Sequence, residues 1–197
     1  MLLIRICILA GLMVHKLVWE VFKRQRGGSP RSRSADPAGL RIIRLVKIGV
    51  LLGIAVQTLI PPVLPINNMP AAGVALGLLL YTGGLLLAIA ARVELGRNWS
   101  DIEAGTVQPS HVVVSTGVYR FMRHPIYTGD LALLLGLELA LGSWLALLVL
   151  LLAPIVLRRA LDEERKLSIL IKGYDRYCEQ TNRFLPSPAR FFSRSSR

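Results

Sequence analysis

Long apolar segments alternate with short polar segments along this chain, and their lengths predict helices that cross a membrane. The apolar segments cover residues 2–22, 45–60, 71–93 and 126–157. A helix needs about 20 apolar residues to cross the hydrocarbon core of a bilayer, whereas a strand needs only about 10. Pro61 and Pro62 end the second segment because proline cannot continue a helix. The pattern therefore predicts an all-α integral membrane protein.

The first apolar segment has two interpretations, a cleaved signal peptide and a retained helix. A signal peptide has an uninterrupted apolar region followed by a cleavage site with small residues. His15, Lys16 and Glu20 interrupt this segment, and no such site follows it. We therefore expect a retained membrane helix.

The last apolar segment is 32 residues long, which allows one long helix or a hairpin of two short ones. Gly142 and Ser143 lie at its midpoint and suit a turn. The segment 23–47 carries eight basic residues against one acidic residue, so we expect it on the cytoplasmic side. The basic residues that follow Leu157 must lie on that side too. Only a hairpin satisfies both conditions, which predicts five membrane helices with the N-terminus outside and the C-terminus in the cytoplasm.

Two further features concern packing and the C-terminal tail. The spacings Gly49/Gly53 and Gly73/Gly77 would let helices approach closely. Apolar residues at helical spacing over residues 159–181 predict a C-terminal amphipathic cytoplasmic helix.

Composition agrees with a membrane protein and excludes two other classes. The chain has 197 residues, of which 53% are hydrophobic and 18% charged, with a net charge of +12. The basic residues flank apolar segments, where they would face anionic lipids, so we expect membrane lipids as partners and no nucleic acid. Cys7 and Cys178 are far apart, and the histidines His15, His111 and His124 are isolated from one another. We therefore expect no metal.

The sequence Arg123-His124-Pro125 marks the start of the hairpin's first helix, because proline is favoured at the first helical position. The free N–H groups at a helix start attract anions, and Arg123 would add a positive charge. Tyr127 and Gly129 follow on the first turn. The alternative is a basic cap that only anchors this helix.

A second polar cluster, Arg158-Arg159-Ala160-Leu161-Asp162-Glu163-Glu164, follows the hairpin. Arg159 and Glu163 are four residues apart and share one helical face. The alternative is a surface salt bridge. Asp130 and Glu138 lie inside the hairpin's first helix, where Asp130 would reach toward the polar clusters and Glu138 would lie at the outer membrane interface.

These motifs together resemble the isoprenylcysteine carboxyl methyltransferase family, in particular its bacterial members. The resemblance rests on Gly117-x-Tyr119-x3-Arg123-His124-Pro125-x-Tyr127-x-Gly129, followed about 35 residues later by Glu163-Glu164. Gly-Arg-Asn-Trp-Ser at 96–100 and Arg-Phe-Leu-Pro at 183–186 add to it. By this resemblance the chain is a single membrane domain. Residues 1–92 hold three helices and the basic loop 23–47, residues 93–188 form the catalytic methyltransferase region, and residues 189–197 form a basic tail.

The resemblance implies S-adenosylmethionine as cofactor, bound at the cytoplasmic surface of what we expect to be a bacterial inner membrane. The implied cofactor contacts are His111, Val112, Val113, Val114, Tyr119, His124, Pro125, Ile126, Tyr127 and Glu163. Arg159 and Glu163 would be catalytic, with Arg159 on the substrate carboxylate and Arg123 as a second substrate-binding residue. Arg158 with Asp162 is a rival register, because Lys172-Gly173-Tyr174 is one residue shorter than the family's usual Phe-Gly-x-x-Tyr.

The resulting hypothesis is O-methylation of the carboxylate of an isoprenoid or other lipid-like substrate embedded in the membrane. A carboxylate is ionised at neutral pH, so the reaction needs positioning rather than a general base. Phospholipid N-methylation is the first alternative and would need a base near the nucleophile. An NADPH-dependent membrane reductase and a non-catalytic membrane scaffold are further alternatives. The chain has no G-x-G-x-x-G motif after a strand, which excludes the soluble doubly wound methyltransferase fold.

Overall fold

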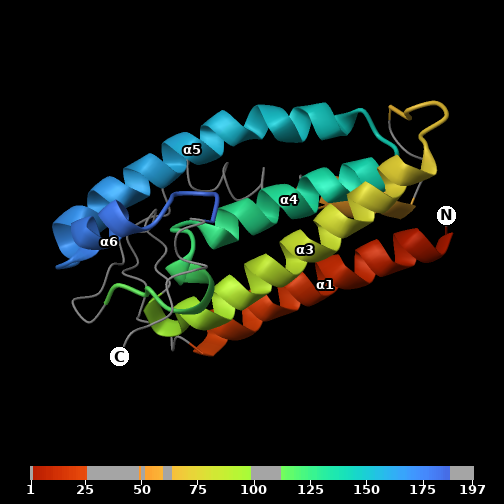
Figure 1. The fold of residues 1–197 in the computed structure, drawn as a ribbon. Helices are drawn as coiled ribbons and strands as arrows, with labels where there is room; N and C mark the ends of the chain where they lie inside the picture. The colour runs from red at the N-terminus through yellow and green to blue at the C-terminus, as the bar shows by residue number, and fades with distance from the viewer. Residues whose placement is uncertain (1, 26–48, 50–51, 60–63, 99–111, 187–197) are drawn as a thin grey trace.

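Four long helices form an elongated bundle (Figure 1). The structure is a computed structural model that describes residues 2–25, 49, 52–59, 64–98 and 112–186. The long helices are α1 (Leu2–Gln25), α3 (Ala71–Leu95), α4 (Pro125–Ala140) and α5 (Leu145–Leu170). The 3₁₀ helices η1 (Gly96–Asn98) and η3 (Gly117–Arg120) and the short α6 (Tyr174–Gln180) lie at the end opposite the N-terminus. The described residues contain no strand, only two isolated bridges, so the predicted all-α class is confirmed for them.

The helices agree with the apolar segments of the sequence where the structure describes them. Leu2–Arg24 and Ala71–Leu95 are long and apolar enough to cross a membrane. The described residues of the second segment, 49 and 52–59, are helical. By length and composition, two helices among the described residues are candidate spans, because α4 has only 16 residues and α5 is charged in its second half.

The segment 126–157 folds as the predicted hairpin. α4 ends at Ala140, and α5 begins at Leu145. The turn passes through Gly142, whose φ of +65° suits glycine, and Ser143, whose hydroxyl accepts a hydrogen bond from the Leu145 N–H. The N–H of Ile66 also donates to the Gly142 carbonyl, which ties this turn to the link before α3.

The prediction of one amphipathic tail helix over residues 159–181 is wrong in its boundaries. Nothing after Leu157 breaks the helix, so α5 continues to Leu170. Ile171 is extended and Gly173 is left-handed, with a φ of +86°, and α6 starts only after them. The charged cluster at 158–164 therefore belongs to the rigid extension of the hairpin rather than to a separate surface helix.

Four glycines bring α3 and α4 into backbone contact. Gly77 and Gly84 of α3 face α4, and Gly129 and Gly136 of α4 face α3. A Cβ atom at any of the four would lie 2.2–2.7 Å from a backbone atom of the opposite helix. The contacts pair the helices antiparallel, with the glycines seven residues apart on each.

The expected pairs Gly49/Gly53 and Gly73/Gly77 are therefore mostly wrong as contact motifs. Gly49 and Gly53 have nothing within 4 Å of a built Cβ, and Gly73 meets only Met69. Two glycines four residues apart suit a single point where two helices cross closely. The helices α3 and α4 stay in contact over two turns, so their small residues are seven positions apart. Gly77 is the member of the expected set that contacts α4.

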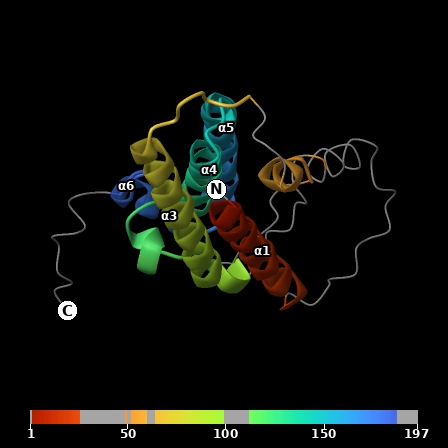
Figure 2. The same cartoon turned by 90° about the vertical axis from the view of Figure 1, so that its right-hand side faces the viewer.

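Buried polar bonds attach the other elements to this pair. The Tyr81 hydroxyl on α3 donates to the Ile8 carbonyl of α1, 2.5 Å away, beside Gly11, whose missing side chain leaves room for the tyrosine. The Gln57 amide donates to the Glu138 carboxylate of α4 at 2.7 Å. Glu138 lies near the end of α4 as expected, but it is buried instead of facing the membrane interface. Figure 2 shows α1 between α3 and the helical residues 52–59.

The close approach of α3 to α4 predicts opposite effects on stability for alanine substitutions at two neighbouring glycines of α3. A Gly84→Ala side chain would meet the Leu133 backbone nitrogen at 2.4 Å, whereas Gly83 has nothing within 4 Å. We expect Gly84→Ala to lower the free energy of unfolding by about 1–3 kcal/mol through overpacking. Gly83→Ala should leave it unchanged or raise it by up to about 1 kcal/mol, because alanine favours helix. Unfolding of both variants in detergent by thermal denaturation measures the difference, and equal stability would contradict this packing.

Candidate active site

The polar residues singled out in the sequence gather at the end of the bundle opposite the N-terminus (Figure 1). α4 starts there and the second half of α5 returns there, because the hairpin is antiparallel. Hydrogen bonds His124–Glu164 and Tyr127–Glu163 span 40 and 36 residues of sequence. The two polar clusters therefore meet, as the hairpin predicts.

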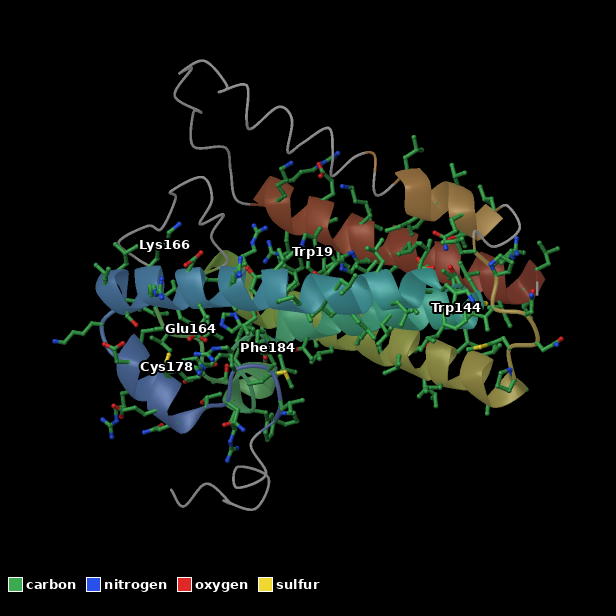
Figure 3. All side chains as sticks on the ribbon, turned by 90° about the horizontal axis from the view of Figure 1, so that it is seen from above. Trp19, Trp144, Glu164, Lys166, Cys178 and Phe184 are labelled. Atoms are coloured by element: carbon green, nitrogen blue, oxygen red, sulfur yellow. The ribbon has the colours of Figure 1, made fainter. Side chains whose placement is uncertain are left out.

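Glu164 is the centre of this end of the protein. Its carboxylate lies 2.9 Å from His124 Nε2 and 3.2 Å from Arg123 Nη1. Arg183 donates to both of its oxygens, from Nε at 3.0 Å and from Nη2 at 2.9 Å. The Glu164 side chain is only 9% exposed, so these partners are what makes its burial as a charged group possible. Figure 3 shows Glu164 pointing into the region between α5 and the segment that carries Phe184.

Hydrogen bonds to Glu164 determine its ionisation. Burial alone would raise the pKa of this carboxyl. The hydrogen bonds from His124 and Arg183 and the charge of Arg123 outweigh burial and lower the pKa to about 2. Glu164 is therefore an anion at neutral pH, and it joins the side chains of Arg123, His124 and Arg183 to α5.

The closing segment of the described chain completes the start of α4. Asn182 and Arg183 accept hydrogen bonds through their carbonyls from the N–H groups of Arg123 and His124, at 2.9 and 3.0 Å. The Thr128 hydroxyl donates to the Phe184 carbonyl at 3.2 Å. The chain itself therefore occupies the N–H groups of Arg123 and His124, the two residues before α4, whereas the free N–H groups expected at the helix start belong to its first turn and stay a prediction. The anion that Arg123 binds in this structure is the Glu164 carboxylate.

Glu163 has a different environment from its neighbour. Its carboxylate accepts a hydrogen bond from the neutral Tyr127 hydroxyl at 2.8 Å and is half-buried. Arg159, one turn earlier on α5, lies close enough to the Tyr127 hydroxyl to interact with it. Tyr127, Arg159 and Glu163 thus form one group, in which a phenol interacts with both an anion and a cation.

The rival register points away from this group. Asp162 pairs with Arg165 at 3.5 Å, and both side chains are largely exposed. Arg158 and Arg159 are both exposed, so exposure does not separate these two arginines. The structure therefore brings Arg159 and Glu163, but not Asp162, to the side of α5 that faces Tyr127.

Tyr119 belongs to η3. Its ring is buried, and its carbonyl accepts a hydrogen bond from the Tyr177 hydroxyl of α6 at 2.7 Å. Burial raises the pKa of the Tyr119 hydroxyl, and the negative charge of Glu163 raises it further. Tyr119 is therefore a neutral phenol close to the Glu163 carboxylate.

A glycine and a carboxylate fix the position of η3. Gly117 has a φ of +47°, and the Glu94 carboxylate occupies the place that a side chain at Gly117 would take. The same carboxylate accepts a hydrogen bond from the Val118 N–H at 2.7 Å. Glycine is required here both for the backbone conformation and for this contact.

The structure describes most of the other residues expected to contact the cofactor, but not all of them. Val112 is exposed, Val113 and Val114 are half-buried, and the Asn98 side chain accepts a hydrogen bond from the Val112 N–H at 3.1 Å. Pro125 is buried and Ile126 is half-buried. His111 lies outside the described residues. Among the residues that the structure describes, no group of three or more His, Cys, Asp or Glu could hold a metal ion.

Sequence reasoning missed the role of Glu164 and Arg183. Both residues stood inside recognised motifs, Glu163-Glu164 and Arg183-Phe184-Leu185-Pro186. Two features of the sequence pointed to them. A second carboxylate, Glu164, directly follows Glu163, and the motif Arg-Phe-Leu-Pro stands near the end of the chain. Those two signals become informative only when the closing segment is known to return to the start of α4.

Comparison with known proteins agrees with a membrane methyltransferase. The family model described as Phospholipid methyltransferase matches residues 72–172, just over half of the chain, from the start of α3 to the end of α5. The chain therefore belongs to the phospholipid methyltransferase family.

A curated relative is the protein-S-isoprenylcysteine O-methyltransferase of Schizosaccharomyces pombe. It is 33% identical over 66 residues, which is 34% of this chain and 28% of the relative. This match confirms the resemblance to isoprenylcysteine carboxyl methyltransferases that the motifs indicate. The matched stretch spans less than a third of the relative's length.

Substitution of the two adjacent glutamates, Glu163 and Glu164, should affect the stability of the protein differently. Glu164→Gln leaves Arg123 and Arg183 without their buried counter-charge, so we expect a loss of about 3–5 kcal/mol in the free energy of unfolding. Glu163→Gln is the matched control and should change stability by less than about 1 kcal/mol. Thermal denaturation of the purified variants measures both losses.

The pH dependence of stability should follow the ionisation of the Glu164 carboxyl. Its folded pKa of about 2 lies below the ordinary value of 4.5 for a glutamate. Its contribution is therefore fully present above about pH 4.5 and is lost as the pH falls toward 2. Glu164→Gln should flatten this part of the stability profile, and an unchanged profile would contradict the assignment.

Proposed function

We propose that this protein is an S-adenosylmethionine-dependent methyltransferase that methylates the carboxylate of an isoprenoid or other lipid-like substrate in the membrane. The observation that carries the proposal is the group of Tyr127, Arg159 and Glu163 at the end of the hairpin. Membership of the phospholipid methyltransferase family supports the methyl transfer. The similarity to an enzyme named for isoprenylcysteine O-methylation supports the acceptor class.

The side chains at this end fit the charge of such a cofactor. S-adenosylmethionine supplies, when bound, an electrophilic methyl group on a positively charged sulfur. Glu163 offers a carboxylate whose hydrogen-bond donor is a neutral hydroxyl, and Tyr119 and Tyr127 offer aromatic rings next to it. Carboxylates and aromatic faces both stabilise cations. The remaining contacts would come from the set Val112, Val113, Val114, His124, Pro125 and Ile126, with His111 as a further candidate.

Arg159 would bind the substrate carboxylate. A guanidinium holds a carboxylate through two parallel hydrogen bonds, which fixes its direction as well as its place. The carboxylate is ionised at neutral pH, so its oxygen can attack the methyl carbon in line with the departing sulfur without a base. Positioning of the two reactants by Arg159 and Glu163 can supply about 7–11 kcal/mol of the lowered barrier. The Glu164 cluster keeps α4 and α5 in the register that this positioning needs.

Arg123 and His124 are also expected to contact the substrate and the cofactor. The prediction that Arg123 binds substrate and His124 binds cofactor stays a prediction. Their contacts with Glu164 support a positioning role. The His124 ring, which Glu164 holds, stacks on the Tyr127 ring with centroids 5.4 Å apart. Through this stacking, Glu164 would orient the Tyr127 ring.

The membrane arrangement that we propose has five spans, the N-terminus outside and the site at the cytoplasmic face of a bacterial inner membrane. The helices at 2–25 and 71–95, and the apolar segment that contains the helical residues 52–59, would be followed by α4 and the first half of α5 as a short hairpin. At about 1.5 Å per residue the 16 residues of α4 reach roughly 24 Å, so the bilayer would be thin at the hairpin. A thin bilayer there would bring a lipid-like acceptor close to Tyr127.

Phospholipid N-methylation is the second candidate, favoured by the description of the matching family. It would use the same cofactor group but a lipid amine in place of a carboxylate. The amine itself needs no carboxylate-binding arginine, but the phosphate of the same lipid can bind one. The two acceptors are therefore separated by the product, a methyl ester or a methylated amine, rather than by loss of Arg159.

Two neighbouring arginines test the proposed substrate contact. We expect Arg159→Ala to lower methyl transfer to an S-prenylated cysteine at least a hundredfold, because the carboxylate loses its paired hydrogen bonds. Binding of S-adenosylmethionine should change less than threefold. Arg158→Ala is the matched control and should retain most activity. Transfer of labelled methyl groups and calorimetric binding of the cofactor measure the two quantities, and undiminished transfer by Arg159→Ala would refute the role of this arginine.

The topology can be tested with single cysteines. In a protein with Cys7 and Cys178 replaced by serine, Asn67→Cys and Lys172→Cys place one thiol at each end of the bundle, at exposed positions. In right-side-out vesicles an impermeant maleimide should label position 67 directly and position 172 only after permeabilisation. Labelling of both positions from the same side would contradict the five-span arrangement.

A further inference from the structure

Two side chains from the end of α3 and from η1 hold one short segment of the chain, residues 112–118, at both of its ends. The Glu94 carboxylate accepts a hydrogen bond from the Val118 N–H at 2.7 Å. The Asn98 side chain accepts one from the Val112 N–H at 3.1 Å. Glu94 belongs to the last turn of α3, and Asn98 ends η1, which follows α3 directly. We call Glu94 and Asn98 the clamp of this segment.

The clamped segment leads into the proposed cofactor site. It contains the three valines at 112–114 that are expected to contact the cofactor, and Tyr119 follows it in η3. The charge of Glu163 acts on the Tyr119 hydroxyl, so these two side chains are close to each other. The helix η3 packs against α3, and α3 is in backbone contact with α4 through glycines (Figure 1). The clamp therefore ties the segment to the helix pair from which Tyr127 reaches the same site.

The two hydrogen bonds of the clamp lie at the surface, unlike those of the buried Glu164 cluster. Both bonds are exposed, and Glu94 and Val112 are exposed residues. Water replaces such bonds when they break, so they contribute little to global stability, and a segment held by them opens locally at a small cost in free energy. Gly117, inside the segment, restrains the backbone less than any other residue would. The clamp thus controls how often the segment 112–118 is closed on α3.

We propose that Glu94 and Asn98 are positioning residues for the cofactor, which hold the segment 112–118 in the conformation that binds S-adenosylmethionine. This inference rests on the proposed function and deepens it. The Glu94 carboxylate packs against Gly117 and Val118, so it acts through the segment rather than on the cofactor. A ligand that binds one conformation has an apparent Kd equal to its intrinsic Kd divided by the fraction of molecules in that conformation. Loss of the clamp therefore weakens cofactor binding and has little effect on turnover once the cofactor is bound.

The affinity for the cofactor tests the proposal. The Kd of S-adenosylmethionine is measured by calorimetry on the full-length protein in phospholipid nanodiscs, and kcat is measured at saturating cofactor with an S-prenylated cysteine. We expect Glu94→Ala to raise the Kd about tenfold, since it removes a hydrogen bond to a charged group. The same variant should change kcat less than about twofold. Glu94→Gln keeps an oxygen that can accept from the Val118 N–H and should restore part of the affinity.

The other end of the segment and a control on α1 complete the set of variants. Asn98→Ala removes a neutral hydrogen bond, so we expect a smaller rise in Kd, about three- to fivefold. Asn98→Asp keeps the acceptor oxygen and should restore part of this loss. Glu20→Ala is the matched control, because it removes another exposed carboxylate that accepts a hydrogen bond, here from Arg24. The Kd of this variant should equal that of the wild-type protein.

Hydrogen exchange separates positioning from a general loss of structure. Without cofactor, the amides of residues 112–119 should exchange faster in Glu94→Ala than in the wild-type protein, whereas the amides of α3 and α4 should exchange at the wild-type rate. Saturating S-adenosylmethionine should restore the protection of residues 112–119.

The contrary results distinguish this inference from the proposed function. A wild-type Kd in Glu94→Ala, no recovery of affinity in Glu94→Gln, or faster exchange throughout α3 and α4 would each overturn this inference and leave the proposed function standing. A wild-type protein that binds no S-adenosylmethionine would overturn the proposed function itself, and this inference with it.

Discussion

One buried carboxylate, that of Glu164, holds the functional end of the molecule together. It joins the start of α4 through Arg123 and His124, the extension of α5 on which it lies, and the closing segment through Arg183. A buried anion is tolerated only with partners on all sides, so these segments have little freedom to move independently. The chain thus supplies its own anion to a helix start that would otherwise attract one from outside.

The division of work between Glu163 and Glu164 follows from this constraint. Consecutive residues on a helix point about 100° apart, so only one of two adjacent glutamates can face the cluster. Glu164 faces His124 and the arginines, and Glu163 faces the Tyr127 hydroxyl together with Arg159, one turn away on the same helix. Because the cluster is rigid, the second group is held in a fixed geometry, which is what a reaction governed by positioning requires.

Local patterns in the sequence predicted the helices and the hairpin, because charge and apolar length are local properties. They also predicted that residues 123–129 meet residues 158–164, since a hairpin returns the chain to one face. They did not predict which glycines face each other, since Gly77 and Gly84 work with Gly129 and Gly136 at a spacing that depends on the partner helix. They also missed the return of Asn182 and Arg183 to the helix start, because no local signal records a contact across 59 residues. The Gly173 break shows the same limit, as apolar spacing continued through it.

The central claim is that this site transfers a methyl group to a carboxylate, and the stability of the product to alkali tests it most directly. Carboxyl methyl esters release methanol in base, whereas methylated amines are stable. The purified protein in vesicles that contain both an S-prenylated cysteine and phosphatidylethanolamine is incubated with methyl-labelled S-adenosylmethionine, and the lipid extract is treated with base. The account predicts that most of the transferred label is released as volatile methanol. Label that remains non-volatile after this treatment would contradict it.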